Sequence, residues 1–317
     1  MNIKKVISCD WGTSSFRLRL INAETKAVLA ETKSAQGIAA TYALWKEEKN
    51  ADRFSFYVNV ILSHILELEQ QYKYSLDGVT IIISGMASAT IGMMELPYKS
   101  IPFNVKKAEL EMHFTPASES CRHKIIIISG VRSANDVMRG EETIIAGCAI
   151  EDIPQVQLFI FPGTHSKHVT VQNGMITDVK TYMTGEVFEL LSTKSILSAS
   201  VEKDNSTETN NTSFIKGIKE SVDANLLNNI FHVRTNSLFE SHTKKENYHY
   251  LSGLLIGEEL KNIQATNYMS VTIVSTGSLL PLYLDALSAL GLKEKLRQQN
   301  ADEALVNGQV FVFNHYL

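Results

Sequence analysis

The fold is decided by the stretch VISCDWGTSSFRLRLI, residues 6–21. Its apolar beginning ends in an acid, Asp10, and the turn that follows at residues 11–15 contains a glycine and three hydroxyl side chains. From Phe16 to Ile21 apolar and polar residues alternate, which is typical of a half-buried strand. A second turn then leads to another extended run. The sequence therefore predicts three strands joined by hairpins at the start of a sheet.

The second half of the chain repeats this pattern in LFIFPGTHSKHVTV, residues 158–171. A strand leads into a Gly-Thr turn, and an alternating strand follows. When the two turns are aligned, Gly12 falls on Gly163 and Arg17 falls near Lys167. A repeat of one supersecondary unit would explain this pattern, and two unrelated hairpins remain the alternative.

Strands and helices alternate along the chain, which indicates an α/β architecture. Short β-branched runs predict buried strands of a mostly parallel sheet, and apolar residues at helical spacing predict helices. Further strands are expected at residues 79–84, 124–129, 176–182 and 271–274, and helices at residues 53–72, 248–263 and 279–290. Gly291 is placed to end the last helix, and the polar run at residues 200–211 predicts a surface loop.

The composition is that of an ordinary globular protein. The 317 residues are 44% hydrophobic and 20% charged, which is enough chain for two domains. A net charge of -4 with mixed signs favours neither nucleic acid nor a membrane as partner. No apolar run approaches the roughly 20 residues that span a bilayer, and residues 1–10 lack the apolar core of a signal peptide. Cys9, Cys121 and Cys148 have neither disulfide-framework nor zinc-site spacing, so we expect a cytoplasmic protein.

The two Gly-Thr turns suit phosphate binding. Glycine lets the backbone approach an anion closely, and the hydroxyls of Thr13, Ser14 and Thr164 add donors. Asp10, at the end of the first strand, is placed to bind Mg²⁺ through water. The sequence contains no GxxxxGK[ST] and has no GxGxxG after its first strand. A P-loop is therefore excluded, and a dinucleotide-binding Rossmann domain is disfavoured.

Three motifs in order carry a resemblance to a known superfamily. DWGTSSFR at residues 10–17 and FPGTHSK at 161–167 resemble the two phosphate motifs of the acetate kinase, sugar kinase and actin superfamily, and STGS at 275–278 resembles its adenosine motif. Further segments in both halves are similar to those of 2-keto-3-deoxygalactonate kinases. These segments are SGMAS at residues 84–88, VMRGEET at 137–143, MTGE at 183–186 and LSGLLIG at 251–257.

The resemblance implies two ribonuclease H-like lobes of the actin-like ATPase fold with a cleft between them. The N-terminal lobe, residues 1–145, is expected to hold the first phosphate motif and the sugar-acid pocket. The C-terminal lobe, residues 146–317, is expected to hold the second phosphate motif and the adenosine motif.

The implied activity is that of a kinase. It would use ATP and Mg²⁺ to phosphorylate the terminal 6-hydroxyl of 2-keto-3-deoxy-D-galactonate in galactonate catabolism, so its expected partner is a small sugar acid; a homodimer stays open. A kinase of the same fold for another sugar acid or polyol stays an alternative, as does a sensor that binds nucleotide or sugar without catalysis.

The resemblance also assigns site residues. Those expected to bind ATP are Gly12, Thr13, Ser14, Arg17, Gly163, Thr164, His165, Lys167, Gly277 and Ser278. Those expected to bind the sugar acid are Gly85, Met86, Ser88, Arg132 and Arg139. Arg139 is the first choice for the substrate carboxylate, because arginine clamps a carboxylate at two points. Asp10 is expected to serve catalysis as the metal ligand.

The general base is expected at the start of a helix, where related kinases place an acid. Glu141 occupies that position. A carboxylate at a helix N-terminus is kept ionised by the helix dipole and can accept the proton of the sugar hydroxyl. Because the wider superfamily uses aspartate there, Glu142 and Asp136 stay as alternatives.

Overall fold

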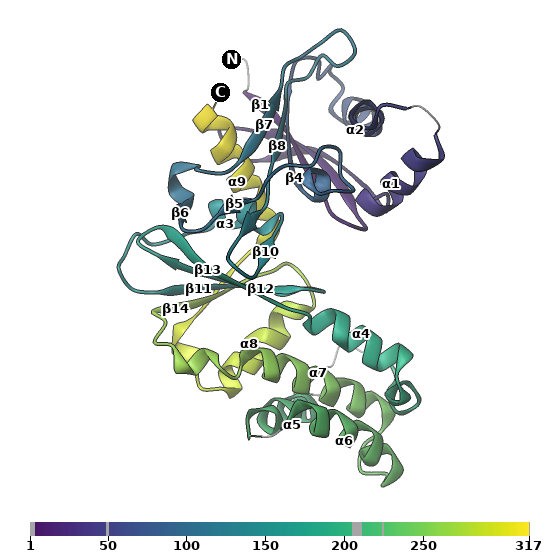
Figure 1. The fold of residues 1–317 in the computed structure, drawn as a ribbon, viewed down its shortest axis with the longest axis vertical. Helices are drawn as coiled ribbons and strands as arrows, with labels where there is room; N and C mark the ends of the chain where they lie inside the picture. Colours follow the sequence, from purple (N-terminus) through teal and green to yellow (C-terminus); the bar gives the residue numbers. More distant parts are fainter. Residues whose placement is uncertain (1–3, 49–50, 205–210, 224, 317) are drawn as a thin grey trace. The chain divides into compact units, whose positions relative to one another are not determined.

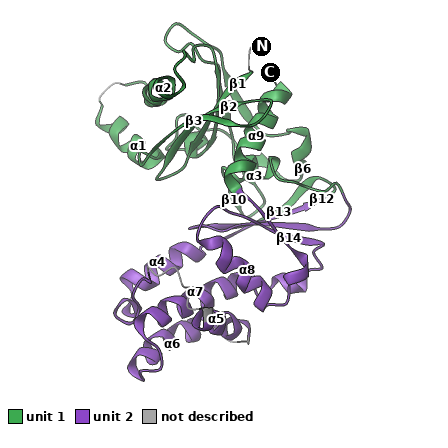
Figure 2. Ribbon diagram, turned by 180° about the vertical axis from the view of Figure 1, so that it is seen from behind, with its two compact units in different colours: residues 1–152, 173–179, 301–317 green, residues 153–172, 180–300 purple. Residues whose placement is uncertain are grey.

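The computed structural model describes residues 4–48, 51–204, 211–223 and 225–316. Half of the predicted polar loop, residues 205–210, lies outside the described residues. The contacts divide the chain into two compact units (Figure 2). Unit 1 contains residues 1–152, 173–179 and 301–317, and unit 2 contains residues 153–172 and 180–300. The chain therefore returns twice to unit 1.

Unit 1 is built on a mixed six-stranded sheet in the order β3-β2-β1-β4-β8-β7 (Figure 1). Its strands are β1 (Lys5–Trp11), β2 (Phe16–Asn22), β3 (Val28–Ser34), β4 (Thr80–Gly85), β7 (Met112–Thr115) and β8 (Ile125–Ile128). β4 runs parallel to β1 and to β8, whereas β2 is antiparallel to β1 and to β3. The three hairpin-linked strands and the two buried parallel strands are as the sequence predicts.

Burial explains why this sheet is parallel at its centre. Every residue of β4 (TIIISG) and β8 (IIII) is buried, as expected for strands covered on both faces. The predicted helix at residues 53–72 is α2 (Arg53–Tyr72), which packs Tyr57 and Ile61 into the core of this sheet. Asp52 accepts a hydrogen bond from the Ser55 N–H at 2.8 Å, which satisfies a free donor at the start of the helix.

The second six-stranded sheet has the order β15-β14-β11-β12-β13-β6. Its strands are β6 (Phe103–Asn104), β11 (Gln157–Phe161), β12 (Ser166–Gln172), β13 (Met175–Tyr182), β14 (Ser270–Val274) and β15 (Leu296–Gln299). β11 is antiparallel to β12 and parallel to β14, which is parallel to β15.

Both sheets share one plan. In each, the first strand lies beside an antiparallel second strand, the third strand follows the second, and two parallel strands lie on the other side of the first. The sequence thus predicts the internal repeat correctly. The α/β fold with two ribonuclease H-like sheets, the actin-like ATPase fold, is confirmed.

The helices of unit 2 are α4 (Thr184–Lys194), α5 (Asn211–Asp223), α6 (Leu226–Leu238), α7 (Lys244–Leu260) and α8 (Leu279–Ala289). Glycine lets α5 and α7 touch: a Cβ on Gly253 would lie 2.1 Å from the Phe214 carbonyl oxygen. α7 begins before the predicted residue 248, because Thr243 and Glu246 form a capping box at its start. α8 ends before Gly291, which has a φ of +80°, as its predicted role as a helix stop requires.

The last helix, α9 (Ala301–Tyr316), belongs to unit 1. The expected division into residues 1–145 and 146–317 placed it in the second lobe. It packs on α3 (Glu141–Ala146) so closely that a Cβ on Gly308 would lie 1.9 Å from the Thr143 carbonyl oxygen. Gln309 also donates a hydrogen bond to the backbone of β1 at 3.0 Å. These contacts, made far along the sequence, tie the end of the chain to its beginning.

Several short elements of unit 1 were not predicted. Among them are α1 (Ile38–Glu47) and the strands β5 (Lys99–Ser100), β9 (Val131–Arg132) and β10 (Val137–Met138). The three strands form a separate sheet in the order β10-β9-β5.

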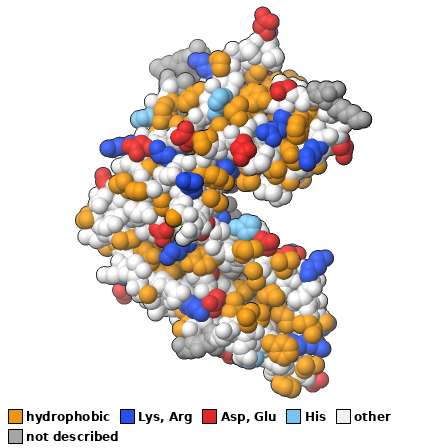
Figure 3. Space-filling view, in the orientation of Figure 1, with side chains coloured by type: hydrophobic (Ala, Val, Ile, Leu, Met, Phe, Trp, Pro, Cys, Tyr) orange, Lys and Arg blue, Asp and Glu red, His pale blue; other side chains and the backbone are white. Residues whose placement is uncertain are grey.

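Acidic and basic side chains are interspersed over the face shown in Figure 3. In the part of the chain that the structure describes, no helix combines the length and apolarity that a bilayer crossing requires.

Candidate active site

The turn between β1 and β2 is fixed by its own backbone. The N–H of Gly12 donates to the Ser15 carbonyl at 2.9 Å, and the N–H of Ile38 in α1 donates to the Gly12 carbonyl at 3.0 Å. Thr13 and Ser14 remain exposed at its tip. The turn is therefore rigid while its hydroxyl side chains stay accessible to an anion, as the predicted phosphate role requires.

Asp10 lies in β1 directly opposite Arg17 in β2. Burial raises the pKa of the Asp10 carboxyl, and the guanidinium groups of Arg17 and Arg19 offset this only in part. An added cation beside Asp10 would favour its ionised form. Mg²⁺ prefers oxygen ligands and is often held by one or two carboxylates together with substrate phosphates. Asp10 therefore fits a magnesium ligand. Within the described ranges, no group of three or more His, Cys, Asp or Glu is arranged so that it could hold a metal ion by itself.

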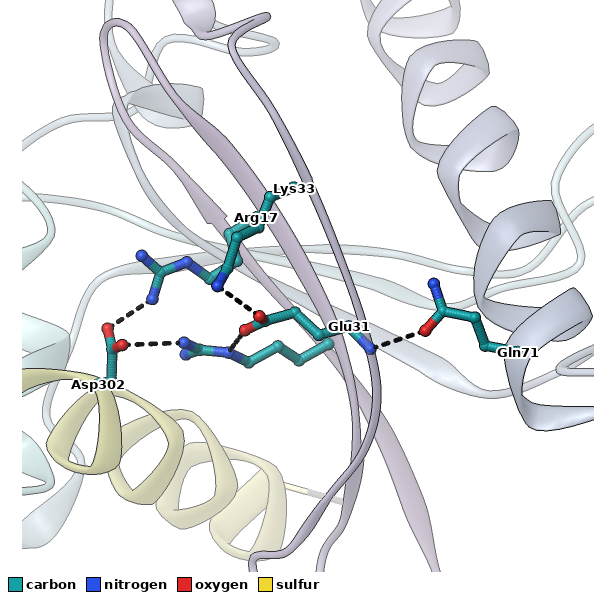
Figure 4. Close-up of polar contacts among 6 residues, drawn as sticks. Arg17, Glu31, Lys33, Gln71 and Asp302 are labelled. Carbon is teal, nitrogen blue, oxygen red and sulfur yellow. Dashed lines mark hydrogen bonds and ion pairs between the residues drawn. The ribbon is translucent and has the colours of Figure 1, made fainter.

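Asp302 of α9 bridges the two arginines of β2 (Figure 4). Its carboxylate lies 2.5 Å from Nη1 of Arg17 and 3.2 Å from Nη2 of Arg19. Arg19 is also held by Glu31, at 2.6 Å from its Nε, and Glu31 pairs with Lys33 at 2.6 Å. The predicted phosphate ligand Arg17 is thus tied to the last helix, a contact that the sequence does not indicate.

The predicted sugar-acid residues Ser88 and Arg139 contact each other in unit 1. Nη1 of Arg139 donates to the carbonyl of Ser88 at 2.7 Å and also to its hydroxyl, and the guanidinium lies 4.3 Å from the ring centroid of Tyr98. Nε of Arg139 is buried and finds no hydrogen-bond partner among the described residues. Gly140, the residue after Arg139, lies against Gly85, which has a φ of +91°. A Cβ on Gly140 would lie 3.4 Å from the Gly85 Cα.

Two other predicted substrate residues are placed differently. Met86 begins a short 3-10 helix (Met86–Ser88) and is half-buried against the core of unit 1. Arg132 of β9 is exposed, and its Nε donates to the Ser100 hydroxyl at 3.3 Å. The structure therefore gives Arg132 a hydrogen bond within the small sheet rather than with the Ser88–Arg139 pair.

The two candidate bases at the start of α3 differ in burial. Glu142 has no exposed surface; its carboxylate accepts from the Gly140 N–H at 2.7 Å and the Thr143 hydroxyl at 3.0 Å. Burial, with the nearby charge of Glu141, raises the pKa of Glu142 to about 8. Glu141 is half-buried and accepts from the Arg139 N–H at 3.0 Å. Glu142 therefore supports the loop from within, and Glu141 is the better placed to meet a substrate.

The third candidate base, Asp136, lies in the turn between β9 and β10. Its carboxylate accepts from the N–H of Val137 at 2.8 Å, and its carbonyl accepts from the N–H of Ser133 at 2.8 Å. The side chain is half-buried. Its local bonds are those of a turn residue.

The turn between β11 and β12 is the corresponding feature of unit 2. A Cβ on Gly163 would meet no atom within 4 Å, whereas one on Gly185 of α4 would lie 2.7 Å from the Gly163 carbonyl oxygen. Thr164 and His165 are exposed, and Nε2 of His165 lies 2.5 Å from the Glu186 carboxylate. The Gly163 carbonyl side of the turn thus packs on α4, and the Cα of Gly163 faces open space.

Lys167 is more enclosed than its expected phosphate role suggests. The side chain is 8% exposed, and its Nζ donates to the His165 carbonyl at 3.3 Å. Gly277, between β14 and α8, has no atom within 4 Å of a Cβ position, and Ser278 follows it directly before the helix. Gly163 and Gly277 thus share one property: a side chain at either position would contact no other part of the described protein within 4 Å of its Cβ.

Sequence reasoning missed three acids that organise these turns: Asp302, Glu186 and Glu259. Glu259 is buried in α7 and accepts hydrogen bonds from β12, α4 and α8. The segment around Glu186 resembles the kinase family, but its pairing with His165 required coordinates. No pattern in the sequence singles out Glu259, which follows another acid, Glu258, and lies two residues before Lys261.

Comparison with known proteins gives one consistent result. A family model described as 2-keto-3-deoxy-galactonokinase matches residues 10–312. A Rhizobium meliloti (strain 1021) protein named probable 2-dehydro-3-deoxygalactonokinase DgoK1 is 33% identical over 307 residues, covering 94% of this chain and 93% of its own. The Escherichia coli (strain K12) 2-dehydro-3-deoxygalactonokinase is 29% identical over 219 residues, 67% of this chain and 71% of its own.

A solved structure agrees with these relatives. It is a crystal structure of a Sinorhizobium meliloti protein assigned as a 2-dehydro-3-deoxygalactonokinase. It is 30% identical to this chain with a TM-score of 0.83, covering 98% of this chain and 96% of its own.

Proposed function

Because the chain belongs to the 2-keto-3-deoxy-galactonokinase family, we propose that it transfers the terminal phosphoryl group of ATP to 2-keto-3-deoxy-D-galactonate. The acceptor is the terminal 6-hydroxyl of the sugar acid. The reaction is a step of galactonate catabolism and takes place in the cytoplasm, where ATP is supplied. A kinase of this family acts on a small molecule.

One arrangement in unit 1 carries the proposal: a guanidinium and a carboxylate flank Gly140 on one loop. Ser88 and Tyr98 hold the guanidinium of Arg139, and its Nε has no partner among the described residues. A guanidinium binds a carboxylate through two parallel N–H bonds. We therefore assign the acid end of the substrate to Arg139, with Gly85 and Ser88 supporting the loop.

Glu141 is the proposed general base. Its carboxylate is half-buried two residues from Arg139, whereas the neighbouring Glu142 is enclosed. The hydroxyl oxygen of the sugar acid attacks the terminal phosphorus of ATP, the bond to the leaving ADP oxygen breaks, and the hydroxyl proton passes to Glu141. This step needs a carboxylate that can take up a proton, and the Glu141 carboxylate accepts a hydrogen bond from the Arg139 N–H.

The nucleotide is assigned to the glycine turns of both units. Thr13 and Ser14 offer exposed hydroxyls in unit 1, and the open space over Gly163 and Gly277 in unit 2 lets an anion or a ring approach the backbone. Mg²⁺, held by Asp10 and by phosphate oxygens, would neutralise phosphate charge. Positioning and charge stabilisation supply most of the catalysis of phosphoryl transfer.

An ADP-release assay with a panel of acceptors tests this function. The panel contains 2-keto-3-deoxy-D-galactonate, its C4 epimer, a 3-deoxy sugar without the carboxylate, and a simple polyol. We expect the highest kcat/KM with the first compound and a large loss without the carboxylate, because the guanidinium of Arg139 would then be left unpaired.

Two outcomes would contradict the proposal. Faster turnover of another sugar acid or of the polyol would assign a different substrate to the same chemistry. Binding of MgATP without turnover of any acceptor would favour the sensor. Whether the protein forms a homodimer stays open, and light scattering on the purified protein tests it.

A further inference from the structure

The buried carboxylate of Glu259 joins four parts of unit 2. Glu259 lies near the end of α7 and is 3% exposed. Its Oε1 accepts from the Ser166 hydroxyl at 2.7 Å and contacts Nε2 of His168 at 2.8 Å. Its Oε2 accepts from the Tyr283 hydroxyl at 2.7 Å and from the Thr184 hydroxyl. A carboxylate has about four acceptor sites, so all of them are used.

The donors come from the segments to which the nucleotide is assigned. Ser166 and His168 begin β12, directly after the turn of Gly163 and Thr164. Thr184 is the first residue of α4, and the next residue, Gly185, packs against the Gly163 carbonyl. Tyr283 lies on α8, the helix that follows Gly277 and Ser278. One side chain is therefore bonded to the strand that follows the predicted phosphate turn, to the helix that packs against this turn, and to the adenosine helix.

The electrostatics favour a fixed charge at this place. Burial raises the pKa of the Glu259 carboxyl, but the hydrogen bond and charge of His168 and the bonds from Thr184 and Ser166 outweigh burial and leave this pKa below its ordinary value. A buried ionised group is weak evidence for stability, since apolar replacements of buried charges are often neutral or stabilising. A buried carboxylate does fix the orientation of the side chains that bond it, because each donor must point at one of its two oxygens.

We propose that Glu259 is a positioning residue for nucleotide binding: its carboxylate holds the Gly163–Thr164 turn, the start of α4 and the adenosine helix α8 in one arrangement. It does so through Ser166, Thr184 and Tyr283 and touches no ligand itself. The inference rests on the proposed function only in taking the nucleotide to bind at these turns. Residues of unit 1 that are assigned to the sugar acid are not involved.

The test measures MgATP binding to the full-length protein by calorimetry, without any sugar acid. Glu259→Gln keeps the shape of the side chain but replaces two acceptor sites with donors. Misplacement of positioning residues by about 1 Å can cost about 100-fold in reaction rate. For the affinity of a nucleotide that several displaced segments bind, we expect a smaller effect, a rise of about tenfold in the Kd for MgATP. In the kinase assay the KM for MgATP should rise while that for the sugar acid stays unchanged.

Glu220→Gln is the matched control. Glu220, on α5 of the same unit, accepts a hydrogen bond from the buried Tyr250, so the change removes a similar hydroxyl–carboxylate bond away from the turns. It should leave the Kd for MgATP unchanged. If Glu259→Gln does not fold, Tyr283→Phe takes its place with Tyr250→Phe as control, and a several-fold weaker affinity is expected for the first alone.

Two results would overturn the positioning role: a Kd for MgATP in Glu259→Gln equal to that of the parent, or an equal rise in Glu220→Gln. For the tyrosine variants, an unchanged Kd in Tyr283→Phe, or an equal rise in Tyr250→Phe, would overturn the role in the same way. If the parent protein binds MgATP but phosphorylates no sugar acid, the proposed function fails while this test still gives an answer.

Discussion

Asp302 lies 2.5 Å from the guanidinium of Arg17, although 285 positions of sequence separate them. The arginine belongs to the second strand and the acid to the second residue of the last helix. Because the helix begins beside β2, its first turn supplies an anion to the hairpin that carries the predicted phosphate turn. The last helix therefore helps to orient the Arg17 side chain in the second strand.

Replacing Asp302 with asparagine should weaken MgATP binding more than it weakens the fold. The side chains of Arg17 and Asp302 are 28% and 41% exposed, so their ion pair contributes about 1 kcal/mol or less to the free energy of unfolding. The second partner of Asp302, the buried Arg19, keeps its pair with Glu31 at 2.6 Å in the variant. A released Arg17 must be ordered again when it binds phosphate, at about 0.5–1.5 kcal/mol, or about two- to tenfold in Kd. Calorimetry with MgATP and urea unfolding measure the two effects.

Asp77→Asn is the control for this variant. It breaks the exposed pair with Arg122, at 2.7 Å, which lies outside the predicted site. It should change neither the affinity for MgATP nor the kinetics. An Asp302→Asn protein with the MgATP affinity of the parent would show that the pair does not orient Arg17 for the nucleotide.

Glu141→Gln should leave MgATP binding nearly intact and lower kcat by about 10²- to 10⁴-fold, as loss of a general base does. Glutamine keeps the size of the side chain but cannot take up the proton of the sugar hydroxyl. Single-turnover measurements with the preferred sugar acid give the rate of the chemical step directly.

Asp136→Asn provides the comparison, because Asp136 is the other partly exposed acid near the helix start. Its kcat should equal that of the parent. A large loss of kcat in Asp136→Asn together with an active Glu141→Gln would transfer the role of the base to Asp136.

The strand pattern and the two Gly-Thr turns could be predicted from the sequence because they are local. Alternation over residues 16–21 and the buried runs at 79–84 and 124–129 each encode one strand, and each appears in the structure. The start of α3 at Glu141 is local too. The repeat followed from comparing these local patterns.

The contacts that organise the site are long-range, and no local pattern encodes them. Asp302 looks like an ordinary acid in the first turn of a helix, and Glu259 follows another acid, Glu258, as many surface residues do. The apolar residues of the last helix predict burial but not on which sheet, so its assignment to unit 1 needed coordinates. The roles given to the individual site residues stay predictions.

Gly163→Ala should show whether the glycine is needed for nucleotide binding or for folding. A methyl group there meets no protein atom within 4 Å, so the free energy of unfolding should stay close to that of the parent. If phosphate approaches this backbone, the methyl group will stand in its way and MgATP binding will weaken strongly. Thermal unfolding and calorimetry on the same sample measure both.

Gly185→Ala is the counterpart. Its methyl group would lie 2.7 Å from the Gly163 carbonyl oxygen, so the fold itself must shift and stability should fall. Unaltered MgATP affinity in Gly163→Ala would remove the Gly163 turn from the nucleotide site.

Glu142 should make the stability of the protein depend on pH. Its pKa is about 8 in the folded protein, because burial and then the charge of Glu141 oppose ionisation, against an ordinary value of 4.5. Between these two values the unfolded chain has lost the proton and the folded protein still holds it, so unfolding releases a proton. The free energy of unfolding therefore falls as pH rises from about 5 to about 8, by up to about 1.4 kcal/mol per pH unit, and levels off above.

Glu142→Gln removes this titration while one amide oxygen can still accept from the Gly140 N–H. Its stability should be flatter between pH 5 and pH 8 than that of the parent, and the advantage of the variant should grow with pH, because no charge has to be buried. Urea unfolding at several pH values, with the exposed Glu95→Gln as control, measures the slopes. Equal slopes in the parent and in Glu142→Gln would mean that the buried carboxyl ionises as easily in the folded protein as in the unfolded chain, and that α3 tolerates a buried charge.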